Sequence, residues 1–390
     1  MSLSEVVSTL AQVPTLLKVA RELKPRPLDT RDCMAARFEA TVNRYAERPA
    51  IIFEGRTLSW RELNALANRY ARCLKALGLK REDAVSVMME NRIEFVATLV
   101  ALNKLGLGAA LINTNLTGRP LTHCLSITGS SVCIFGEERL EAIASVRDKP
   151  ELQDIGAYLF VPDSGTTPCP AWSRDLREEA EDESTENPAD TGENTLGQDA
   201  LYIFTSGTTG LPKAAVVSNR RLILTGGLSY RAGLQCDEKD CIYLCLPLYH
   251  GTGLFLGMGA SFLSGATMFV RRKFSASNFL PEVREHGATC FIYIGELCRY
   301  LLQTPVQQDD HQNPLTKVMG NGLRPDVWHE FKDRFGIQRV AEFYGASEGN
   351  VGFVNMLNKD CTVGTTAIPL ALVKYDVDAD EIVRDLSLIH

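Results

Sequence analysis

The first residues that could carry chemistry form a short run of hydroxyl groups and glycines. An apolar stretch at 202–204 leads into it, Lys213 follows it, and the run itself is Thr205, Ser206, Gly207, Thr208, Thr209 and Gly210. Glycine lets the backbone approach an anion closely, and the hydroxyl and amide groups can donate hydrogen bonds to that anion. Because Lys213 adds a positive charge, the run predicts a phosphate-binding loop. An ordinary Ser/Thr/Gly turn is the alternative.

The spacing excludes the Walker A type of phosphate loop. That type needs a lysine directly after its last glycine and a helix behind it. Here Leu211 and Pro212 separate Gly210 from Lys213, and the residues that follow favour a strand.

A second group follows a predicted strand that ends at Phe343. It presents Tyr344, Gly345, Ser347 and Glu348. An aromatic face can pack against a base, and a carboxylate is the kind of hard oxygen ligand that Mg²⁺ prefers. Taken alone, Tyr344 could be a core residue and Glu348 a surface charge.

Two further turns follow predicted strands. One consists of Gly320, Asn321, Gly322 and Leu323, and the other, within 246–253, contains His250, Thr252 and Gly253. Glycine-rich turns can offer backbone groups to a ligand. An isolated histidine such as His250 is more often a packed or surface residue than a ligand.

Together these runs resemble the motifs of the adenylate-forming superfamily, which comprises acyl-CoA synthetases, luciferases and peptide-synthetase adenylation domains. The string from Thr205 to Lys213 resembles the superfamily's motif for the ATP phosphates, and 344–348 resembles its Tyr-Gly-x-Thr/Ser-Glu motif. The sequence GNGLRP at 320–325 is similar to the corresponding motif of the fatty-acid-transport and very-long-chain acyl-CoA synthetase branch. The resemblance runs from Trp60 to about Arg384.

This resemblance implies a reaction and a role for each residue. A fatty acid would react with ATP and Mg²⁺ to give an acyl-adenylate and pyrophosphate, and the adenylate would then form a thioester with CoA. The expected catalytic residues are Thr205, Lys213 and Glu348, with Glu348 also the metal ligand. The expected substrate residues are His250, Thr252, Gly253 and Gly257. The expected nucleotide contacts are Thr205, Ser206, Gly207, Thr208, Thr209, Gly210, Lys213, Gly320, Asn321, Gly322, Leu323, Tyr344, Gly345, Ser347 and Glu348.

An uncharged segment at 251–270 is rich in glycine. It predicts a buried helix followed by a strand, with a membrane span as the alternative. Small residues on a buried helix would leave room for a long acyl chain. Replacing Gly257 or Gly259 by Leu or Phe should therefore shorten the accepted chain.

Apolar periodicity predicts the elements that must position these residues. A Ser59–Glu62 capping box opens a helix that ends at Gly78. Strands are predicted at 84–88, 109–112, 132–135, 200–204, 214–217, 242–246, 267–270, 289–294, 316–319 and 340–343, with helices at about 93–105, 120–127 and 220–230. The alternation favours βαβ units and mainly parallel sheets. The resemblance narrows this α/β class to the large N-terminal domain of the adenylate-forming enzymes.

The chain divides into four predicted segments. They are an N-terminal amphipathic helix over 1–24, a first α/β subdomain over 25–173, an acidic linker or mobile loop over 174–199, and a second α/β subdomain over 200–390 with the nucleotide and acyl motifs. The N-terminal helix carries Leu3, Val6, Leu10, Val13, Leu17 and Ala20 near one face. It could dock on the protein or lie on a membrane surface.

Composition sets limits on partners and compartment. The chain of 390 residues has a net charge of −7 and shows no basic stripe, so nucleic acid is not expected as a partner. Eleven scattered cysteines, with no Cys-x-x-Cys pair, favour buried free thiols in a reducing compartment. The expected place is the cytoplasm, either free or bound peripherally at the inner face of the cell membrane.

Some parts of the superfamily pattern have no match in this sequence. These are a ribose-binding Asp, an Arg-containing hinge, and a C-terminal lid domain with a late catalytic Lys. We therefore expect a truncated chain whose activity in the full reaction is weak or absent. An adenylating enzyme for another carboxylic acid, and a non-catalytic nucleotide- or acyl-binding fragment that assists fatty-acid uptake, remain open as alternatives.

Overall fold

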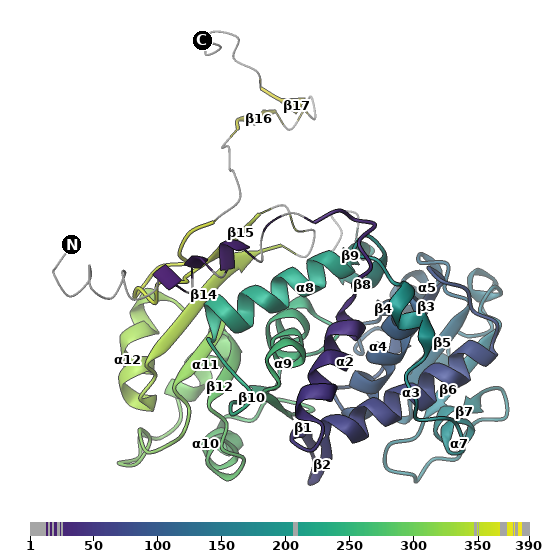
Figure 1. Ribbon diagram of the computed structural model, residues 1–390, viewed down its shortest axis with the longest axis horizontal. Coiled ribbons are helices and arrows are strands. Elements are labelled where there is room, and N and C mark those ends of the chain that lie inside the picture. Colours follow the sequence, from purple (N-terminus) through teal and green to yellow (C-terminus); the bar gives the residue numbers. More distant parts are fainter. Residues whose placement is uncertain are drawn as a thin grey trace.

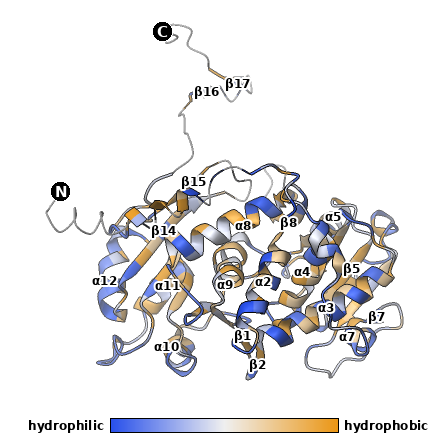
Figure 2. Cartoon of the chain, in the orientation of Figure 1, coloured by the Kyte–Doolittle hydropathy of each residue, from blue (hydrophilic) through white to orange (hydrophobic). Residues whose placement is uncertain are grey.

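Two mainly parallel sheets organise the chain, with helices between them and on their outer faces (Figure 1). The computed structural model describes residues 13–14, 16–17, 19–21, 24, 26–205, 210–346, 349, 351–366, 373–376, 378 and 381–383. Apolar residues concentrate on the strands and central helices, and hydrophilic residues lie on the outward turns (Figure 2). This distribution is that of layered sheets whose helices bury one or more faces.

The seven-stranded sheet carries the first motif at one edge. Its strand order is β7-β6-β5-β3-β4-β8-β9, and all neighbours are parallel except the antiparallel pair β8 and β9. The strands are β3 Ala84–Met88, β4 Gly108–Leu111, β5 Val132–Gly136, β6 Ala157–Val161, β7 Arg174–Asp175, β8 Asp199–Thr205 and β9 Lys213–Ser218.

The eight-stranded sheet carries the other motifs. Its order is β15-β14-β13-β12-β10-β11-β1-β2, parallel from β14 to β1 and antiparallel at both ends. The strands are β1 Pro49–Phe53, β2 Arg56–Ser59, β10 Cys241–Leu244, β11 Thr267–Val270, β12 Cys290–Ile294, β13 Lys317–Asn321, β14 Arg339–Gly345 and β15 Gly352–Val354. A separate ribbon pairs β16 Tyr375–Asp376 with β17 Glu381–Ile382.

A layer of helices lies between the two sheets (Figure 1). Every residue of α4 is buried, which identifies it as a central helix. Phe38, Trp60 and Phe262 meet edge to face and join three helices of this layer. The helices of this layer are α2 Met34–Tyr45, α3 Trp60–Ala76, α4 Ile93–Leu105, α8 Asn219–Leu228, the π-helical turns η4 Ser229–Gly233 and η5 Thr252–Met258, and α9 Gly259–Ser264.

Shorter helices follow the strands of both sheets. They are α5 Gly118–Ser126, α6 Leu140–Ala144, α7 Leu176–Ala180, α10 Ala276–Glu285, α11 Gly295–Leu302 and α12 Pro325–Phe335, with 3₁₀ turns η1 Glu137–Arg139, η2 Pro150–Leu152 and η3 Ala189–Glu193. The predicted strands and helices are confirmed, most of them within two residues at each end. The Ser59–Glu62 capping box is also present, and the helix that follows it ends just before Gly78.

The sheets do not follow the predicted subdomain boundaries. Strands β1 and β2 join the eight-stranded sheet although they precede 174–199, and β8 and β9 join the seven-stranded sheet although they follow it. Hydrophobic periodicity indicates which segments form strands. The pairing of those strands depends on contacts between residues that are far apart in the sequence.

The acidic segment 174–199 differs from the expected exposed linker or mobile loop. It contains β7, α7 and η3, and its Asn194 is fully buried. The side-chain oxygen of Asn187 accepts hydrogen bonds from Asn64, Asn68 and Lys104 of the central helices. Hydrogen bonds from its polar side chains to buried polar partners therefore anchor the segment. Composition alone predicts that these polar side chains are exposed to solvent.

The N-terminal segment is described only in part. Leu3, Val6 and Leu10 lie outside the described residues, whereas 13–14, 16–17 and 19–21 are helical. Val19 is buried, and Leu17 is 66% exposed. Among the residues that the structure describes, no helix has both the length and the apolar character needed to cross a membrane. The segment 251–270 forms η5, α9 and β11, which confirms the predicted buried helix and strand.

The cysteines are as the sequence predicts. All eleven are free thiols, nine of them buried, and Cys361 is exposed. Burial raises the pKa of buried thiols such as Cys124 and Cys133 to about 12, so these groups stay protonated at neutral pH.

Candidate functional site

The predicted phosphate-binding loop joins the two antiparallel strands β8 and β9. Thr205 ends β8 directly opposite Lys213, which begins β9, so the hydroxyl and the ammonium group stand at the two ends of one hairpin loop. Lys213 is exposed, and Gly210 has a φ of +87°, which glycine adopts without strain. Ser206, Gly207, Thr208 and Thr209 lie outside the described residues.

A histidine on a neighbouring helix holds the end of this loop. The ring Nε2 of His123, on α5, lies 2.9 Å from the carbonyl oxygen of Pro212. A carbonyl can only accept, so the ring nitrogen donates, and this bond fixes the tautomer of His123. Sequence reasoning missed His123, because nothing in the order of residues shows that α5 packs beside the loop.

The second motif lies at the end of β14. Tyr344 is 58% exposed and pairs with Phe353 of β15, with ring centroids 6.2 Å apart. Such an exposed ring, supported from one side, is available as a platform for a planar base. Ser347 and Glu348 lie outside the described residues. Within the described ranges, no group of three or more His, Cys, Asp or Glu side chains is placed to hold a metal.

One helix connects the two motifs. Helix α8 begins directly after β9, and Nη2 of its Arg221 donates to the carbonyl oxygen of Ala346 at 2.9 Å. A Cβ atom at Gly349 would lie 2.5 Å from the guanidinium carbon of Arg221, the movable end of that side chain, and the φ of +78° at Gly349 favours glycine there. Figure 1 shows β8 and β9 along the same side of the molecule as β14 and β15, with α8 between them.

The glycine-rich turn at the end of β13 is held by a buried carboxylate. Glu342 is 3% exposed and accepts hydrogen bonds from the backbone N–H groups of Gly322 and Leu323 and from the hydroxyl of Tyr293. The bond from Leu323 is 3.1 Å long. Burial raises the pKa of Glu342 above its ordinary value, although these hydrogen bonds oppose the shift.

Glycine at position 320 makes this arrangement possible. Tyr293 and Glu342 flank Gly320 on the two neighbouring strands, so the Tyr293 ring must pass over β13 to reach the carboxylate. A Cβ atom at Gly320 would lie 2.7 Å from that ring and 2.1 Å from the Tyr293 carbonyl oxygen. Sequence reasoning missed both Tyr293 and Glu342, and the available indication was one acid among the apolar residues in the middle of β14.

Asn321 provides a direct test of whether this turn fits a ligand. Its side-chain oxygen Oδ1 is buried and has no hydrogen-bond partner in the described part of the chain. Buried polar atoms without partners are rare and costly in folded proteins. An acceptor at the end of β13, next in register to Ile294 at the end of β12, suits a donor such as the amino group of an adenine.

The turn that contains His250 is fixed by a residue of the other sheet. The side-chain nitrogen of Asn91 donates to the carbonyl oxygen of Leu246 at 2.8 Å, and its side-chain oxygen accepts from the Leu248 N–H at 2.8 Å. Asn91 is buried, so these bonds tie the turn after β10 to the turn after β3. Sequence reasoning missed Asn91 as well.

His250 itself is open to solvent on one side. Protein atoms on its other side, among them the Tyr249 ring at 4.9 Å, remove part of its hydration and lower its pKa. The neutral imidazole is therefore the favoured form at pH 7. Gly253 packs against the same turn, because a Cβ atom there would lie 3.0 Å from the Leu246 carbonyl oxygen.

The glycines of the helical segment that follows serve close packing. A Cβ atom at Gly226 of α8 would lie 2.9 Å from the Gly259 carbonyl carbon, so two backbones meet there. At Gly257 a Cβ atom would lie 2.0 Å from Cδ2 of Leu244, the movable end of a side chain. Of the two glycines proposed to line an acyl pocket, Gly257 is thus the one beside a side chain that can move.

This difference leads to a prediction about the length of the fatty acid that the site accepts. We expect Gly257→Leu to shift the preference in acid-dependent ATP–pyrophosphate exchange toward shorter fatty acids, because the new side chain competes with Leu244 for space. Gly226→Ala is the packing control. It should lower the melting temperature, as overpacking costs about 1–3 kcal/mol, without changing the ratio of rates between acids. Identical chain-length profiles for Gly257→Leu and the wild type would contradict the prediction.

Comparison with solved structures confirms the predicted fold class. The inhibitor-bound N-terminal domain of FACL13 from Mycobacterium tuberculosis matches with a TM-score of 0.75 and 21% sequence identity. The match covers 90% of this chain and 86% of that chain. At this identity the likeness concerns the fold alone.

The sequence profile of the AMP-binding enzyme family matches residues 38–385, and the chain belongs to that family.

Two relatives also match the predicted branch. One is the medium/long-chain-fatty-acid–CoA ligase FadD6 of Mycobacterium tuberculosis, which is 36% identical over 379 residues, or 97% of this chain and 61% of the relative. The other is the human long-chain fatty acid transport protein 1, which is 37% identical over 363 residues, or 89% of this chain and 55% of the relative. The chain thus spans somewhat more than half the length of the curated relatives it matches.

Proposed function

We propose that this chain forms the nucleotide- and acyl-binding part of a long- or very-long-chain fatty acid–CoA ligase. Such an enzyme joins a fatty acid to AMP with release of pyrophosphate and then transfers the acyl group to CoA. Membership of the AMP-binding family and the names of the two relatives support this reaction class. The strongest structural support is the Asn321 turn, whose buried acceptor oxygen has no partner among the described residues.

The residues of the chain would act mainly by positioning and by charge. Thr205 would donate a hydrogen bond to the ATP phosphates, and the exposed ammonium group of Lys213 would offset their negative charge. The adenine would lie between the Tyr344 ring and the turn at 320–323. Glu348 would hold Mg²⁺, which supplies further neutralisation of the phosphates when bound.

The acyl side of the site would use the turn after β10. His250 and Thr252 stand where this turn enters η5, and Gly257 lies further along the same helical segment. A neutral His250 suits a border between a carboxylate and an apolar chain, because it can donate a hydrogen bond without carrying a charge. Asn91 would act as a positioning residue by fixing the turn.

Acid-dependent exchange of radiolabelled pyrophosphate into ATP tests this proposal. We expect exchange with long-chain or very-long-chain fatty acids, and loss of it by orders of magnitude in Glu348→Ala. Exchange that depends only on short or aromatic acids would assign the chain to another adenylating activity. Exchange that Glu348→Ala leaves unchanged would overturn the assigned nucleotide site.

A second candidate function is nucleotide or acyl binding without catalysis, in support of fatty-acid uptake. The name of the human relative, a fatty acid transport protein, favours testing it. Calorimetric titration with ATP separates the two functions. Binding of ATP without any acid-dependent exchange would favour the non-catalytic role, whereas binding with exchange would favour the ligase.

A further inference from the structure

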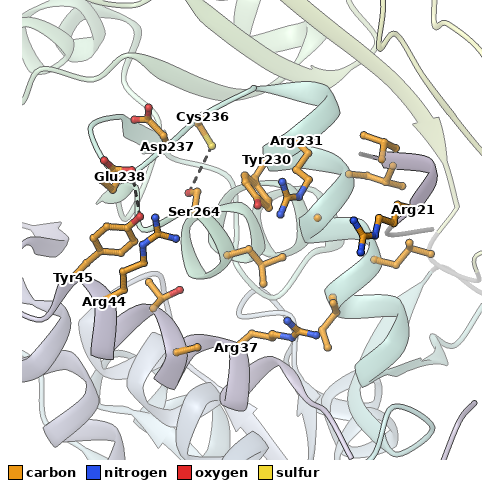
Figure 3. Close-up of a pocket in the computed structure, with 18 of the residues that line it drawn as sticks. Arg21, Arg37, Arg44, Tyr45, Tyr230, Arg231, Cys236, Asp237, Glu238 and Ser264 are labelled. Atoms are coloured by element: carbon orange, nitrogen blue, oxygen red, sulfur yellow. Dashed lines mark hydrogen bonds between the residues drawn. The ribbon is translucent and has the colours of Figure 1, made fainter. Parts of the chain in front are cut away.

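A large cavity lies apart from the strand-end motifs and shares none of their residues (Figure 3). It has a volume of about 1170 Å³ and lies between the N-terminal segment, α2, the α8–η4 helix and the loop after it. The proposed ligase reaction assigns no task to these surfaces.

The cavity carries an excess of positive charge. Two carboxylates, those of Asp237 and Glu238, face six cationic side chains, which are Arg21, Lys24, Arg26, Arg37, Arg44 and Arg231. Asp32, which lies beside the cavity, binds Arg26 at 2.6 Å and Arg37 at 2.5 Å. Among the described residues, three positive charges remain in excess when Asp32 is included, although the whole chain is acidic.

The negative charges lie toward one end of the cavity. The Glu238 carboxylate accepts a hydrogen bond from the Tyr45 hydroxyl at 3.3 Å, and Asp237 precedes it in the same loop. Figure 3 shows Asp237, Glu238 and Tyr45 together, and Arg21, Arg37 and Arg231 around the remaining space. Positive charge therefore dominates away from Glu238, and at the Glu238 end it is supplied by Arg44, which lies beside Tyr45.

Aromatic rings support two of the arginines. The guanidinium of Arg44 lies 5.1 Å from the Tyr45 ring centroid, and that of Arg231 lies 4.6 Å from the Tyr230 ring centroid. Stacking orients the planar guanidinium and leaves its N–H edge directed sideways. An edge of this kind is well suited to the oxygen atoms of a phosphate, which it can bind with two parallel hydrogen bonds.

The remaining lining is apolar. It consists of Val19, Ile223, Leu224, Leu228 and Leu263, with small residues between them. Leu17, in the same N-terminal segment as Val19, is 66% exposed. A site for a free inorganic anion needs no apolar wall, whereas a molecule with a charged head and a hydrocarbon chain would bury its chain against one.

We propose that this cavity binds a phosphate-bearing amphiphile, supplied by the surface of an anionic membrane. The arginines bind the phosphate headgroup, and the apolar wall of α8 and α9 covers the first part of the chain. The exposed leucine of the N-terminal segment then faces the lipid. This site is separate from the proposed ligase site, so either can exist without the other.

Co-sedimentation with lipid vesicles tests the proposal. We expect the full chain to bind vesicles of phosphatidylcholine mixed with phosphatidic acid and not vesicles of phosphatidylcholine alone. Each basic residue near an anionic surface contributes roughly fivefold in affinity. The double variant R44Q/R231Q should thus bind roughly 25-fold more weakly. A matched control, R61Q/R299Q, removes two arginines outside the cavity and should bind like the wild type.

The outcomes separate the sources of the phosphate. Tighter binding of soluble short-chain phosphatidic acid than of glycerol 3-phosphate supports the amphiphile, and equal binding overturns the role of the apolar wall. Equal losses in R44Q/R231Q and in the control would overturn the cavity as the site. Binding of single-stranded RNA in place of vesicles would overturn the lipid assignment. If R44Q/R231Q does not fold, R21Q/K24Q on the N-terminal segment carries the same expectation.

Discussion

Thr205→Val is expected to lower acid-dependent ATP–pyrophosphate exchange by about 10²–10³-fold, the loss typical when one donor to a developing negative charge is removed. Valine keeps the size and β-branching of threonine, so β8 should remain intact. The hydroxyl stands opposite Lys213 at the base of the hairpin loop, where the phosphates are proposed to bind. The measurement is exchange at saturating acid, with the melting temperature recorded for both proteins.

A matched variant shows whether the loss is local. Thr57 is exposed on β2, the opposite edge strand of the other sheet, and Thr57→Val removes the same hydroxyl there. We expect Thr57→Val to keep the exchange rate of the wild type. If Thr205→Val retains full exchange, the loop at 205–213 does not bind the phosphates, and the nucleotide assignment fails with it.

The elements of the fold could be predicted because local patterns decide them. Strands such as β3 and β11 are short apolar runs between turn residues, and the capping box before α3 is a contiguous signature. Their partners could not be predicted. Strand β1 pairs with β11, more than two hundred residues later, and no local pattern records that choice.

The acidic segment shows the limit of composition as a guide. Its many charges predict solvent exposure, but only half of its ten acids are exposed. Three of its polar residues nevertheless decide its structure. Asn187 and Asn194 bind the central helices, and the Asp175 side chain caps α7. A short polar side chain that forms a hydrogen bond with a buried partner can order a segment whose composition predicts an exposed loop.

Within the candidate site, the motif residues could be predicted from the sequence, and the residues that hold the motif turns in place could not. Motif residues such as Lys213 and Tyr344 belong to short contiguous runs that can be recognised in the sequence. Asn91, His123 and Arg221 act across elements, and each holds a backbone carbonyl oxygen of a motif turn. Their roles depend on which helices and turns are in contact, and only the three-dimensional structure shows these contacts.

Glu342→Leu should destabilise the turn at 320–323 and the protein together. Leucine removes the acceptor for Gly322, Leu323 and Tyr293, and each buried donor left without a partner costs about 1–3 kcal/mol. Glu342→Gln keeps an acceptor oxygen but loses the charge. We expect this milder variant to raise the KM for ATP about tenfold, as a charge-assisted hydrogen bond is worth about 1.5–3 kcal/mol, with a smaller change in kcat.

A second buried Tyr–Glu pair serves as the matched control. Glu282 on α10 accepts a hydrogen bond from the Tyr243 hydroxyl at 2.6 Å, but it does not contact the turn at 320–323. Glu282→Gln should lower the melting temperature and leave the KM for ATP unchanged. An equal rise of KM in both variants would show that Glu342 acts through general stability and not as a positioning residue.

The pH dependence of stability gives a further readout of Glu342. Its pKa is raised by burial above the ordinary value of 4.5, so the folded state binds the proton more tightly than the unfolded state. The contribution of this group to the free energy of unfolding is thus largest below pH 4.5 and falls as the pH rises through the raised pKa. Urea denaturation across this range should show that fall in the wild type and its absence in Glu342→Gln. Parallel curves for the two proteins would mean that Glu342 does not titrate in the folded state as its burial requires.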